Sequence, residues 1–306
     1  MEEAVCLKNI TKSFNGQVIL DNINLSIKKG SIVGLLGKNG AGKTTLMKCI
    51  TGLIKPDTGD ILFRDQNFKD KRVNLKTKSI GYIIEYPGFY PDLSAKENLK
   101  IFSLLYGIED NKRIGYVLKK VGLSNTQNKP FKNFSLGMKQ RLGLANALLS
   151  EPEILILDEP INGLDPIGIS QMRDLLKQLC KVEGKTILIS SHILSEIELI
   201  ADEICLLNDK RIIEQVKVKE LEKNKDSYIV IDTDNCKRAI EVIQDRLGIK
   251  LIYRQVEREL RIFNNGIETY RLNDILVNNG IKINEIYREK SGLEEHFKMM
   301  LGERND

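Results

Sequence analysis

The sequence contains no long apolar run. A membrane helix needs roughly 18 to 20 consecutive apolar residues, whereas the longest apolar runs here, such as 154–157 and 187–189, have the length of a strand. No apolar stretch follows a basic start, so we expect no signal peptide. These absences exclude a chain that spans a membrane by itself and favour a cytoplasmic protein, unless another chain recruits it to a membrane.

A strong excess of charge of either sign is also missing. The chain has 47 basic and 42 acidic residues, a net charge of +5, and the charges are interspersed. This pattern argues against a basic arm for nucleic acid, so we expect no nucleic-acid partner. A solvated surface explains the small surplus, and mild attraction to anionic ligands or membrane-proximal partners is the other interpretation.

The cysteines are too widely spaced for a disulfide framework or a metal site. Their number is odd and no two form a C-x-x-C pair: Cys6, Cys49, Cys180, Cys205 and Cys236. Both facts favour free thiols in a reducing compartment.

What the sequence does contain is the pattern of an α/β protein. Hydrophobic residues make up 42% of the chain and charged residues 29%, which suffices for a sizeable core. The strand candidates at 31–36, 154–157 and 186–190 carry their Ile, Leu and Val residues in continuous runs rather than in alternation, as a sheet covered on both faces requires. We therefore predict an α/β sheet with helices on its faces.

A mainly helical stretch follows at about 92–150. Ser94 and Glu97 have the spacing of a capping box, in which the two side chains satisfy each other's N–H groups. This box opens a helix that continues through Tyr106. Two more helices are expected at about 110–121 and 135–149.

The composition changes after Asn208, and the polar stretch 219–226 is typical of a linker. We therefore expect one domain at 1–218 and a small one at 227–306. The expected order of the second is strand, helix, two strands, helix, strand and closing helix, at about 228–231, 236–247, 250–256, 259–263, 268–278, 282–288 and 292–301. This order predicts a small α+β domain of the split-βαβ type.

A glycine-rich segment, GKNGAGKT at 37–44, follows a predicted strand and opens a predicted helix. It fits G-x-x-x-x-G-K-S/T, in which backbone N–H groups and the helix N-terminus bind phosphates. Lys43 reaches the β- and γ-phosphates of ATP, and Thr44 offers its hydroxyl to Mg²⁺. A glycine-rich turn without a ligand is the competing interpretation. The predicted nucleotide-binding residues of this segment are Gly37, Asn39, Gly40, Gly42, Lys43, Thr44 and Thr45.

A pair of acids, Asp158 and Glu159, follows the apolar run 154–157. An open α/β sheet binds its ligands at the carboxyl edge of its strands, where this pair is expected. Asp158 can hold Mg²⁺, usually through water, and Glu159 can polarise a water that attacks the γ-phosphate. A solvated turn is the alternative for such a pair by itself.

The segment SLGMKQR at 135–141, between the glycine-rich segment and the acid pair, completes a familiar series. The chain from residue 4 to about 215 resembles the ATP-binding subunit of an ABC transporter. The resemblance implies a P-loop NTPase fold with a RecA-like core, a helical subdomain, and two ATP molecules between two such domains. It also implies ATPase activity, a second ATP-binding subunit, and permease subunits on separate chains.

Further residues match that family position by position, and their roles follow from the resemblance. Phe14 matches the aromatic residue that stacks on adenine. Ser135 and Gly137 match two positions of the signature, which binds the γ-phosphate of the ATP held by the opposite subunit. Asp165 matches the loop that communicates across the dimer, and His192 matches the switch histidine that senses the γ-phosphate.

The signature departs from the common Leu-Ser-Gly-Gly-Gln. Phe134, Leu136 and Met138 replace the leucine, the first glycine and the glutamine. Ser135 heads a predicted helix, so its hydroxyl and the nearby N–H groups can still bind phosphate. The lost glutamine puts one ribose or phosphate contact in question, but not the sandwich itself.

Glu85 stands where the family has the glutamine of the Gln-loop. That glutamine contacts Mg²⁺ and the attacking water, and its loop responds to the permease. A carboxylate can accept from water and approach Mg²⁺, but it cannot donate as an amide can. We predict a catalytic and metal-binding role for Glu85; a loop acid without a role is the other interpretation.

A narrower resemblance is to bacterial ATPases of the bacitracin-resistance and lantibiotic-immunity type. It rests on 134–142, 162–166, 291–297 and Glu85, and it implies export of an antimicrobial peptide or drug, with the subunit held at the cytoplasmic side of the cell membrane by its permease. An ABC-2 type exporter of a lipid, polysaccharide or ion is an alternative. A non-transport ATPase acting on ribosomes or DNA is disfavoured, because only one P-loop and no long coiled coil are present. For the C-terminal domain we expect either added dimer contacts or the binding of a regulator.

Overall fold

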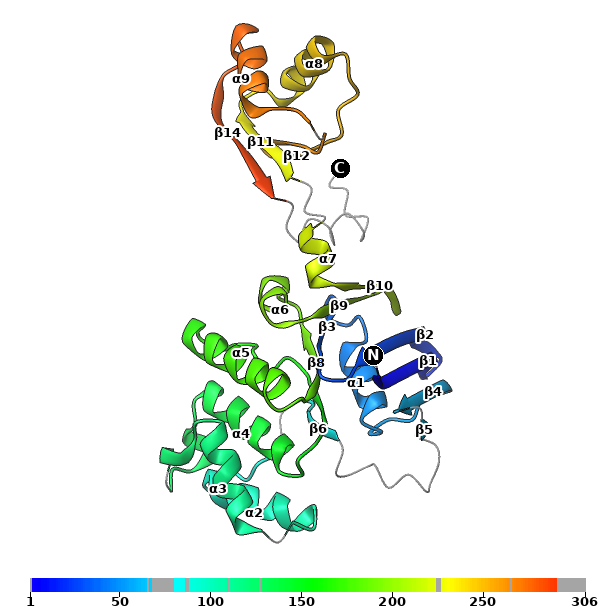
Figure 1. Cartoon of the computed structure of the whole chain (residues 1–306), viewed down its shortest axis with the longest axis vertical. Helices are drawn as coiled ribbons and strands as arrows, with labels where there is room; N and C mark the ends of the chain where they lie inside the picture. Colours follow the sequence, from blue (N-terminus) through cyan, green and yellow to red (C-terminus); the bar gives the residue numbers. More distant parts are fainter. Residues whose placement is uncertain are drawn as a thin grey trace. The chain divides into compact units, whose positions relative to one another are not determined.

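The computed structural model divides the chain into two compact units, Met1–Val218 and Lys219–Asp306 (Figure 1). Each unit has its own hydrophobic core and is described by itself. The structure describes residues 2–64, 66–67, 80–85, 88–108, 110–126, 128–223, 227–264 and 266–290.

The centre of the first unit is a six-stranded sheet with the order β10-β9-β3-β8-β7-β6. Its strands are β3 (Ile32–Leu36), β6 (Ile80–Ile83), β7 (Ile154–Leu157), β8 (Thr186–Ser191), β9 (Glu203–Asn208) and β10 (Arg211–Lys217). All neighbours pair in parallel except β10, which runs antiparallel to β9. Every residue of β3, β7 and β8 is buried, because helices or a second sheet cover both faces. The predicted α/β sheet is confirmed.

Helix α1 (Lys43–Ile50) lies on one face of this sheet, and α5 (Pro166–Lys181) and α6 (Leu194–Ile200) lie on the other (Figure 1). The apolar side of α1, including Leu46 and Met47, packs in one cluster with Val33 and Leu188 of the central sheet. The same cluster includes Leu7 of a second sheet, so α1 is held between two sheets. This double packing fixes the start of α1, where the glycine-rich segment ends.

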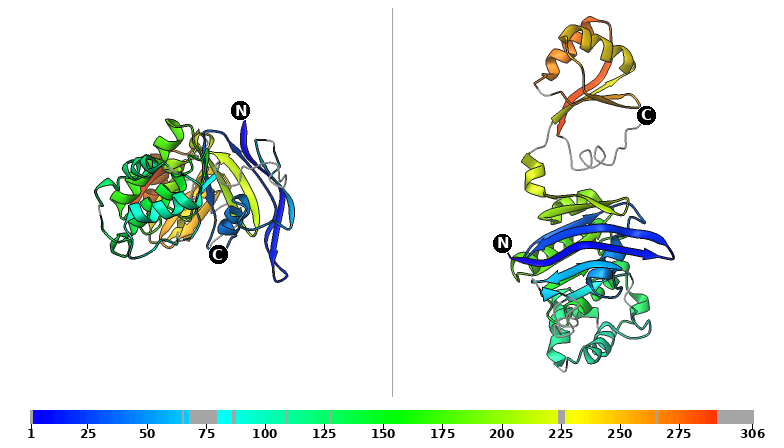
Figure 2. Two further views of the ribbon diagram at one scale, coloured as in Figure 1. Left: turned by 90° about the horizontal axis from the view of Figure 1, so that it is seen from below. Right: turned by 90° about the vertical axis from the view of Figure 1, so that its right-hand side faces the viewer.

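The second sheet is antiparallel and was not foreseen from the sequence. Its order is β2-β1-β4-β5, with strands β1 (Glu3–Phe14), β2 (Gln17–Lys28), β4 (Thr58–Phe63) and β5 (Gln66–Asn67). Figure 2 shows β1 and β2 as a long hairpin. Asn15 and Gly16 form its two-residue turn with φ of 49° and 80°, as a type I′ hairpin requires.

A helical subdomain follows β6, and its helices begin and end close to the expected positions. It contains α2 (Ala95–Leu105), α3 (Asn111–Lys120), η1 (Ser124–Thr126), η2 (Phe131–Asn133) and α4 (Leu136–Leu148). The capping box of Ser94 and Glu97 is present at the start of α2. The buried ring of Phe89 packs edge to face against Phe102 and Phe131, with ring centroids 5.4 and 5.2 Å apart.

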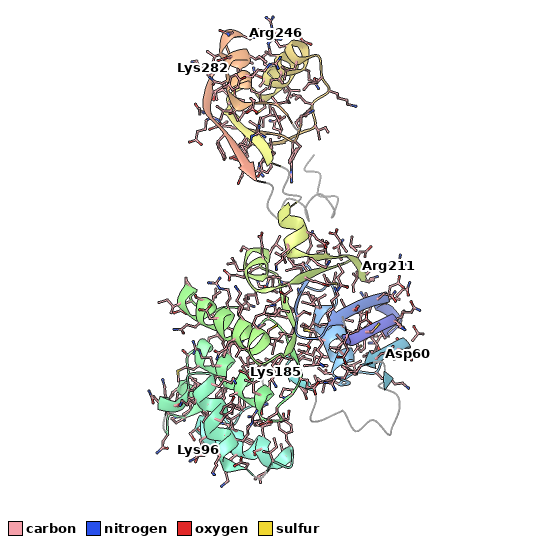
Figure 3. All side chains as sticks on the ribbon, viewed as in Figure 1. Asp60, Lys96, Lys185, Arg211, Arg246 and Lys282 are labelled. Atoms are coloured by element: carbon pink, nitrogen blue, oxygen red, sulfur yellow. The ribbon has the colours of Figure 1, made fainter. Side chains whose placement is uncertain are left out.

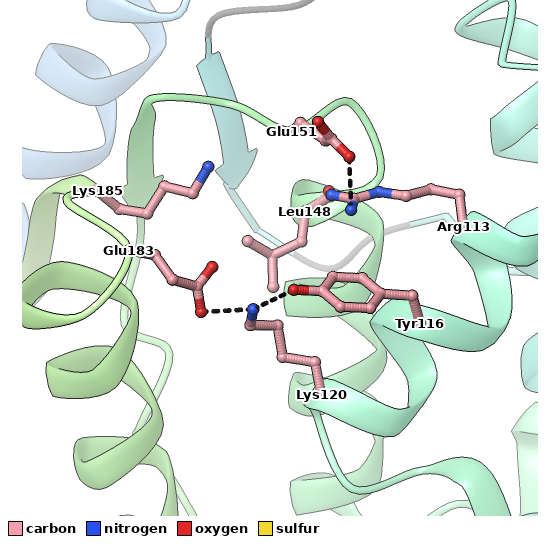
Figure 4. A pocket seen from close by; sticks show the side chains of 7 residues that line it. All are labelled: Arg113, Tyr116, Lys120, Leu148, Glu151, Glu183 and Lys185. Atoms are coloured by element: carbon pink, nitrogen blue, oxygen red, sulfur yellow. Dashed lines mark hydrogen bonds and ion pairs between the residues drawn. The ribbon is translucent and has the colours of Figure 1, made fainter.

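A polar cavity of about 270 Å³ lies between α3 and the turn from α5 to β8 (Figure 4). Lys120 of α3 bonds to Glu183 at 2.5 Å and Arg113 to Glu151 at 2.8 Å. Lys185 donates to the carbonyl of Pro152, and burial lowers the pKa of Lys185. Because each of these basic groups has an acid or carbonyl partner, the cavity links the helical subdomain to the central sheet through its own side chains.

The second unit confirms the predicted split-βαβ arrangement. Its sheet has the order β12-β13-β11-β14 with every neighbour antiparallel. The elements are β11 (Ser227–Thr233), α8 (Cys236–Leu247), β12 (Tyr253–Val256), β13 (Glu259–Ile262), α9 (Thr269–Asn278) and β14 (Ile283–Lys290). The stretch 219–226, expected as a linker, carries α7 (Val218–Lys223) in its first part. The expected closing helix at 292–301 and the segment 291–297 lie outside the described residues.

The structure bears on three expectations from the composition, which concern the charged residues, the cysteines and membrane-spanning helices. The charged residues labelled in Figure 3 for the first unit come from different places in the fold: Asp60 from β4, Lys96 from α2, Lys185 from the turn before β8 and Arg211 from β10. All five cysteines are free thiols, as expected, and burial raises the pKa of Cys49 to about 11. Among the helices of the described residues, none combines the length and the apolar content needed to span a membrane.

Candidate functional site

The glycine-rich segment 37–44 joins β3 to α1 and forms a tight loop. Gly42 caps α1 in the left-handed region, with φ of 108°. A Cβ at Gly42 would lie 2.9 Å from Leu20 Cδ2 and 3.0 Å from the carbonyl oxygen of Ile19. A larger residue would therefore clash with these atoms and would also be strained at this φ angle. The loop therefore presents backbone at the start of α1, which is the arrangement that binds phosphate.

Lys43 is the first residue of α1 and its side chain is only 7% exposed. Its Nζ donates to the carbonyls of Gly37 at 2.7 Å and Lys38 at 3.3 Å. The same ammonium group lies 3.7 Å from Glu159 Oε1. The lysine is thus folded back over its own loop, toward the acid pair.

Asp158 comes directly after β7 and accepts two hydroxyl hydrogen bonds. Thr44 Oγ1 donates to Oδ2 at 2.7 Å, and Ser190 Oγ donates to Oδ1 at 2.6 Å. The Asp158 N–H donates to the carbonyl of Ile83 at 2.7 Å, which ties it to the neighbouring strand. A hydroxyl and a carboxylate side by side are oxygen donors of the kind that Mg²⁺ prefers, so Thr44 and Asp158 fit this ion.

Glu159 has a left-handed backbone, with φ of 48°, and a side chain that is 24% exposed. Its Oε2 lies 2.9 Å from His192 Nδ1, and its N–H donates to Ser190 Oγ at 2.9 Å. Lys43, Glu159 and His192 therefore meet at the carboxyl edge of the parallel strands, although they are far apart in the sequence. This is the edge at which open α/β sheets bind ligands.

Ser190 is the member of this group that the sequence did not reveal. It lies in β8 after the apolar residues 187–189 and before Ser191, and the sequence predicts only that it belongs to a buried strand. The signal available in the sequence is a hydroxyl residue directly after the apolar run 187–189, inside a strand that is expected to be buried. A buried hydroxyl needs a partner, and here the partners are the acids at the end of the neighbouring strand.

Glu85 lies beside this group rather than within it. It follows β6 in a left-handed conformation, with φ of 59°, and its side chain is 65% exposed. Lys48 Nζ donates to its Oε1 at 2.6 Å. Lys48 is one turn after Thr44 on α1, so this ion pair places Glu85 next to the helix that carries the predicted metal ligand.

Phe14 lies at the end of β1 and its side chain is 43% exposed. The ammonium group of Lys12 lies 5.1 Å from the centre of the ring, and Lys12 also pairs with Asp57 at 2.7 Å. An exposed ring with a cation on one face can stack a planar base on the other.

Ser135, Gly137 and Asp165 form a second cluster. Ser135 caps α4 and accepts from the N–H of Met138 at 3.3 Å, and Asp165 caps α5 and accepts from the N–H of Gly168 at 2.8 Å. A Cβ at Gly137 would lie 3.7 Å from Leu164 Cδ2. The first turn of α4 therefore lies next to Leu164, the residue that precedes the cap of α5.

Sequence comparison relates the chain to known proteins. A family model described as ABC transporter matches residues 20–162. The bacitracin transport ATP-binding protein BcrA of Bacillus licheniformis is 40% identical over 99% of this chain and 98% of its own length. The lantibiotic transport ATP-binding protein SrtF of Streptococcus pyogenes is 46% identical over 68% of this chain and 88% of its own length.

Solved structures resemble a shorter part of the chain. A dimeric ATP-binding cassette, MJ0796, in a post-hydrolysis state with ADP and phosphate, has a TM-score of 0.63 at 28% identity and covers 70% of this chain and 98% of its own. CbiO1 of Clostridium perfringens, part of an ABC transporter complex, has a TM-score of 0.65 at 29% identity over 81% of this chain and 97% of its own. The alignment with the bacitracin relative is the longer one and runs through the second unit.

Proposed function

Because the chain belongs to the ABC transporter family of ATP-binding proteins and is an ATPase of that family, we propose that it drives export of an antimicrobial peptide or drug through a separate permease. The observation that carries the mechanism is the meeting of Lys43, Asp158, Glu159 and His192 at one sheet edge. The identity to a bacitracin transport protein over nearly the whole chain supports the substrate class.

ATP binding falls to the loop 37–44 and to Phe14. The N–H groups at the start of α1 bind the phosphates, and Lys43 exchanges its loop carbonyls for phosphate oxygens. Gly37, Asn39, Gly40, Gly42 and Thr45 complete the phosphate cradle, and Phe14 stacks on adenine.

Thr44 and Asp158 are the proposed holders of Mg²⁺, with Glu85 able to reach it through water. When bound, the ion neutralises charge on the phosphates. The Thr44 hydroxyl and the Asp158 carboxylate lie 2.7 Å apart, so both oxygen donors are close enough to bind one ion.

Glu159 is the proposed general base. It takes a proton from the attacking water, and general bases of this kind contribute about 10²- to 10⁴-fold. His192 contacts the carboxylate of Glu159 at 2.9 Å and keeps it turned toward Lys43, where the γ-phosphate would bind.

The second cluster serves a second ATP-binding subunit. Two helix N-termini, capped by Ser135 and Asp165, provide partial positive charge that suits the γ-phosphate of a partner's ATP. We propose a homodimer or a dimer with a close relative, held at the cytoplasmic side of the membrane by permease subunits, with no nucleic acid involved.

The proposed function is tested in a peptide-sensitive bacterium. The membrane chain that co-purifies with this protein is expressed together with it, and growth is measured in bacitracin and in a lantibiotic. Resistance is expected with the wild-type chain and not with Glu159→Gln. Resistance to neither peptide would reject this substrate class in favour of a lipid, polysaccharide or ion. Co-sedimentation with ribosomes and no membrane partner would reject transport altogether.

A further inference from the structure

The hydroxyl of Ser190 contacts both residues of the acid pair, Asp158 and Glu159. Ser190 is the fifth residue of β8, the strand between β3 and β7, and is fully buried, with 0% exposure. We infer that Ser190 is a positioning residue that uses one hydroxyl to set Asp158 and Glu159 relative to each other. This inference rests on the proposed roles of these two acids.

The two hydrogen bonds of Ser190 have opposite directions. Its Oγ donates to Asp158 Oδ1 at 2.6 Å and accepts from the N–H of Glu159 at 2.9 Å. A hydroxyl has one donor and two acceptor positions, so it makes both bonds at once. Alanine makes neither, and no apolar residue replaces them. The side chain therefore joins consecutive residues of one strand end to the neighbouring strand.

On the side of Asp158, Ser190 completes a pair of hydroxyl donors. Thr44 occupies Oδ2 and Ser190 occupies Oδ1, so the plane of the carboxylate is held from both ends. Thr44 is the residue proposed to turn toward the metal. The Ser190 bond then continues to orient Asp158 while the partners of Thr44 change.

On the side of Glu159, Ser190 supports an unfavourable backbone. A left-handed conformation is costly for a residue with a Cβ and persists where the surroundings enforce it. The bond from the Glu159 N–H to Ser190 does so, and the resulting turn directs the carboxylate toward Lys43 and His192. Without this bond the peptide can relax, which moves the base.

A purely structural role for this buried serine makes a different prediction. In that case its loss lowers stability, but the remaining folded protein keeps its turnover number. A positioning role lowers kcat, because misplacing a reacting group by about 1 Å costs on the order of 100-fold. The KM for ATP should change much less than kcat, since no hydrogen bond found among the described residues joins Ser190 to the loop 37–44, and Thr44 still donates to the other oxygen of Asp158.

The test compares Ser190→Ala with Ser103→Ala. Ser103 is also a buried serine with a short bond, 2.6 Å to the carbonyl of Ile108, but it lies in the helical subdomain. Phosphate release, ATP affinity and thermal unfolding are measured on the full chain. Ser190→Ala is expected to lose on the order of 100-fold in kcat with a much smaller change in ATP affinity, whereas Ser103→Ala keeps its kcat.

If Ser190→Ala fails to fold, the variants Ser190→Thr and Ser190→Cys test the positioning role instead. Threonine keeps the hydroxyl and should restore most of kcat, whereas the thiol is a weak donor and acceptor and should not. Wild-type kcat in Ser190→Ala or Ser190→Cys would overturn the inference, as would a raised KM at constant kcat.

Glu159→Gln is assayed in parallel to keep two failures apart. If Glu159→Gln is inactive and Ser190→Ala is fully active, the positioning role is wrong and the proposed base stands. If Glu159→Gln hydrolyses ATP like the wild type, the proposed base itself is wrong.

Discussion

The ends of β6 and β7 make a natural comparison, because each carries a glutamate in the same position. The two strands pair in parallel with Ile83 opposite Leu157. Glu85 and Glu159 each follow the strand end by two residues, and both have a left-handed backbone, with φ of 59° and 48°. The local chain geometry of the two acids is therefore nearly the same.

Their surroundings differ. Glu159 lies next to the central strand β8, and its contacts come from α1 and from β8 and the residue that follows it. Glu85 is on the edge strand β6 and has an exposed ion pair with Lys48. Exposed ion pairs contribute about 0 to 1 kcal/mol to stability, so breaking the pair with Lys48 costs little free energy. The comparison shows that contacts from neighbouring elements hold the side chain of Glu159 in place. The position at a strand end does not do so by itself, because Glu85 has the same position.

The largest effect is expected for Glu159→Gln. The amide cannot accept a proton from water, so hydrolysis should fall by about 10²- to 10⁴-fold while ATP binding is retained. Phosphate release and binding of a fluorescent ATP analogue measure the two properties separately. Wild-type turnover would remove the functional difference between the two strand ends.

Lys43→Ala comes next. Hydrogen bonds to charged groups contribute about 1.5 to 3 kcal/mol, so ATP affinity should fall by roughly 10- to 100-fold. Lys96→Ala, which changes an exposed lysine on α2, is the matched control. Equal affinity of the wild type and Lys43→Ala in equilibrium binding would contradict the assignment of the loop 37–44.

Glu85→Ala should have a smaller effect, a decrease in hydrolysis of less than about tenfold, because its carboxylate is exposed and is held by one surface ion pair. Glu85→Gln, which installs the family residue, should retain activity. A double-mutant cycle with Lys48→Ala measures the coupling of the ion pair, expected below about 1 kcal/mol. If Glu85→Ala left both hydrolysis and peptide resistance unchanged, this acid would have no role at the site.

Removal of the second unit should have the smallest effect on ATP binding. Both glutamates, and every proposed nucleotide contact, lie within Met1–Val218, which has its own core. A fragment of residues 1–218, checked by circular dichroism, should bind ATP with the affinity of the full chain. A large loss of affinity would mean that the second unit is needed for ATP binding by residues 1–218.

Some of the fold could be predicted because its signals are local. The continuous apolar runs indicated buried strands, the spacing of Ser94 and Glu97 indicated a helix start, and the element order after Asn208 indicated a split-βαβ domain. The antiparallel sheet was missed because β1 and β2 are irregular. Register shifts and left-handed residues such as Asn9 and Asn22 interrupt the alternation that marks an exposed strand.

The sequence by itself determined which chemical groups the chain carries and the short segments that present them: the loop before α1, the acids after β7 and the histidine after β8. Only the tertiary structure decided that Ser190 bridges the two acids and that Lys48 is the partner of Glu85. These contacts depend on the strand order β3-β8-β7-β6 and on the seat of α1 between two sheets. A motif is read along the chain, but a hydrogen bond between strands follows from which strands become neighbours, and that is fixed by packing over the whole unit.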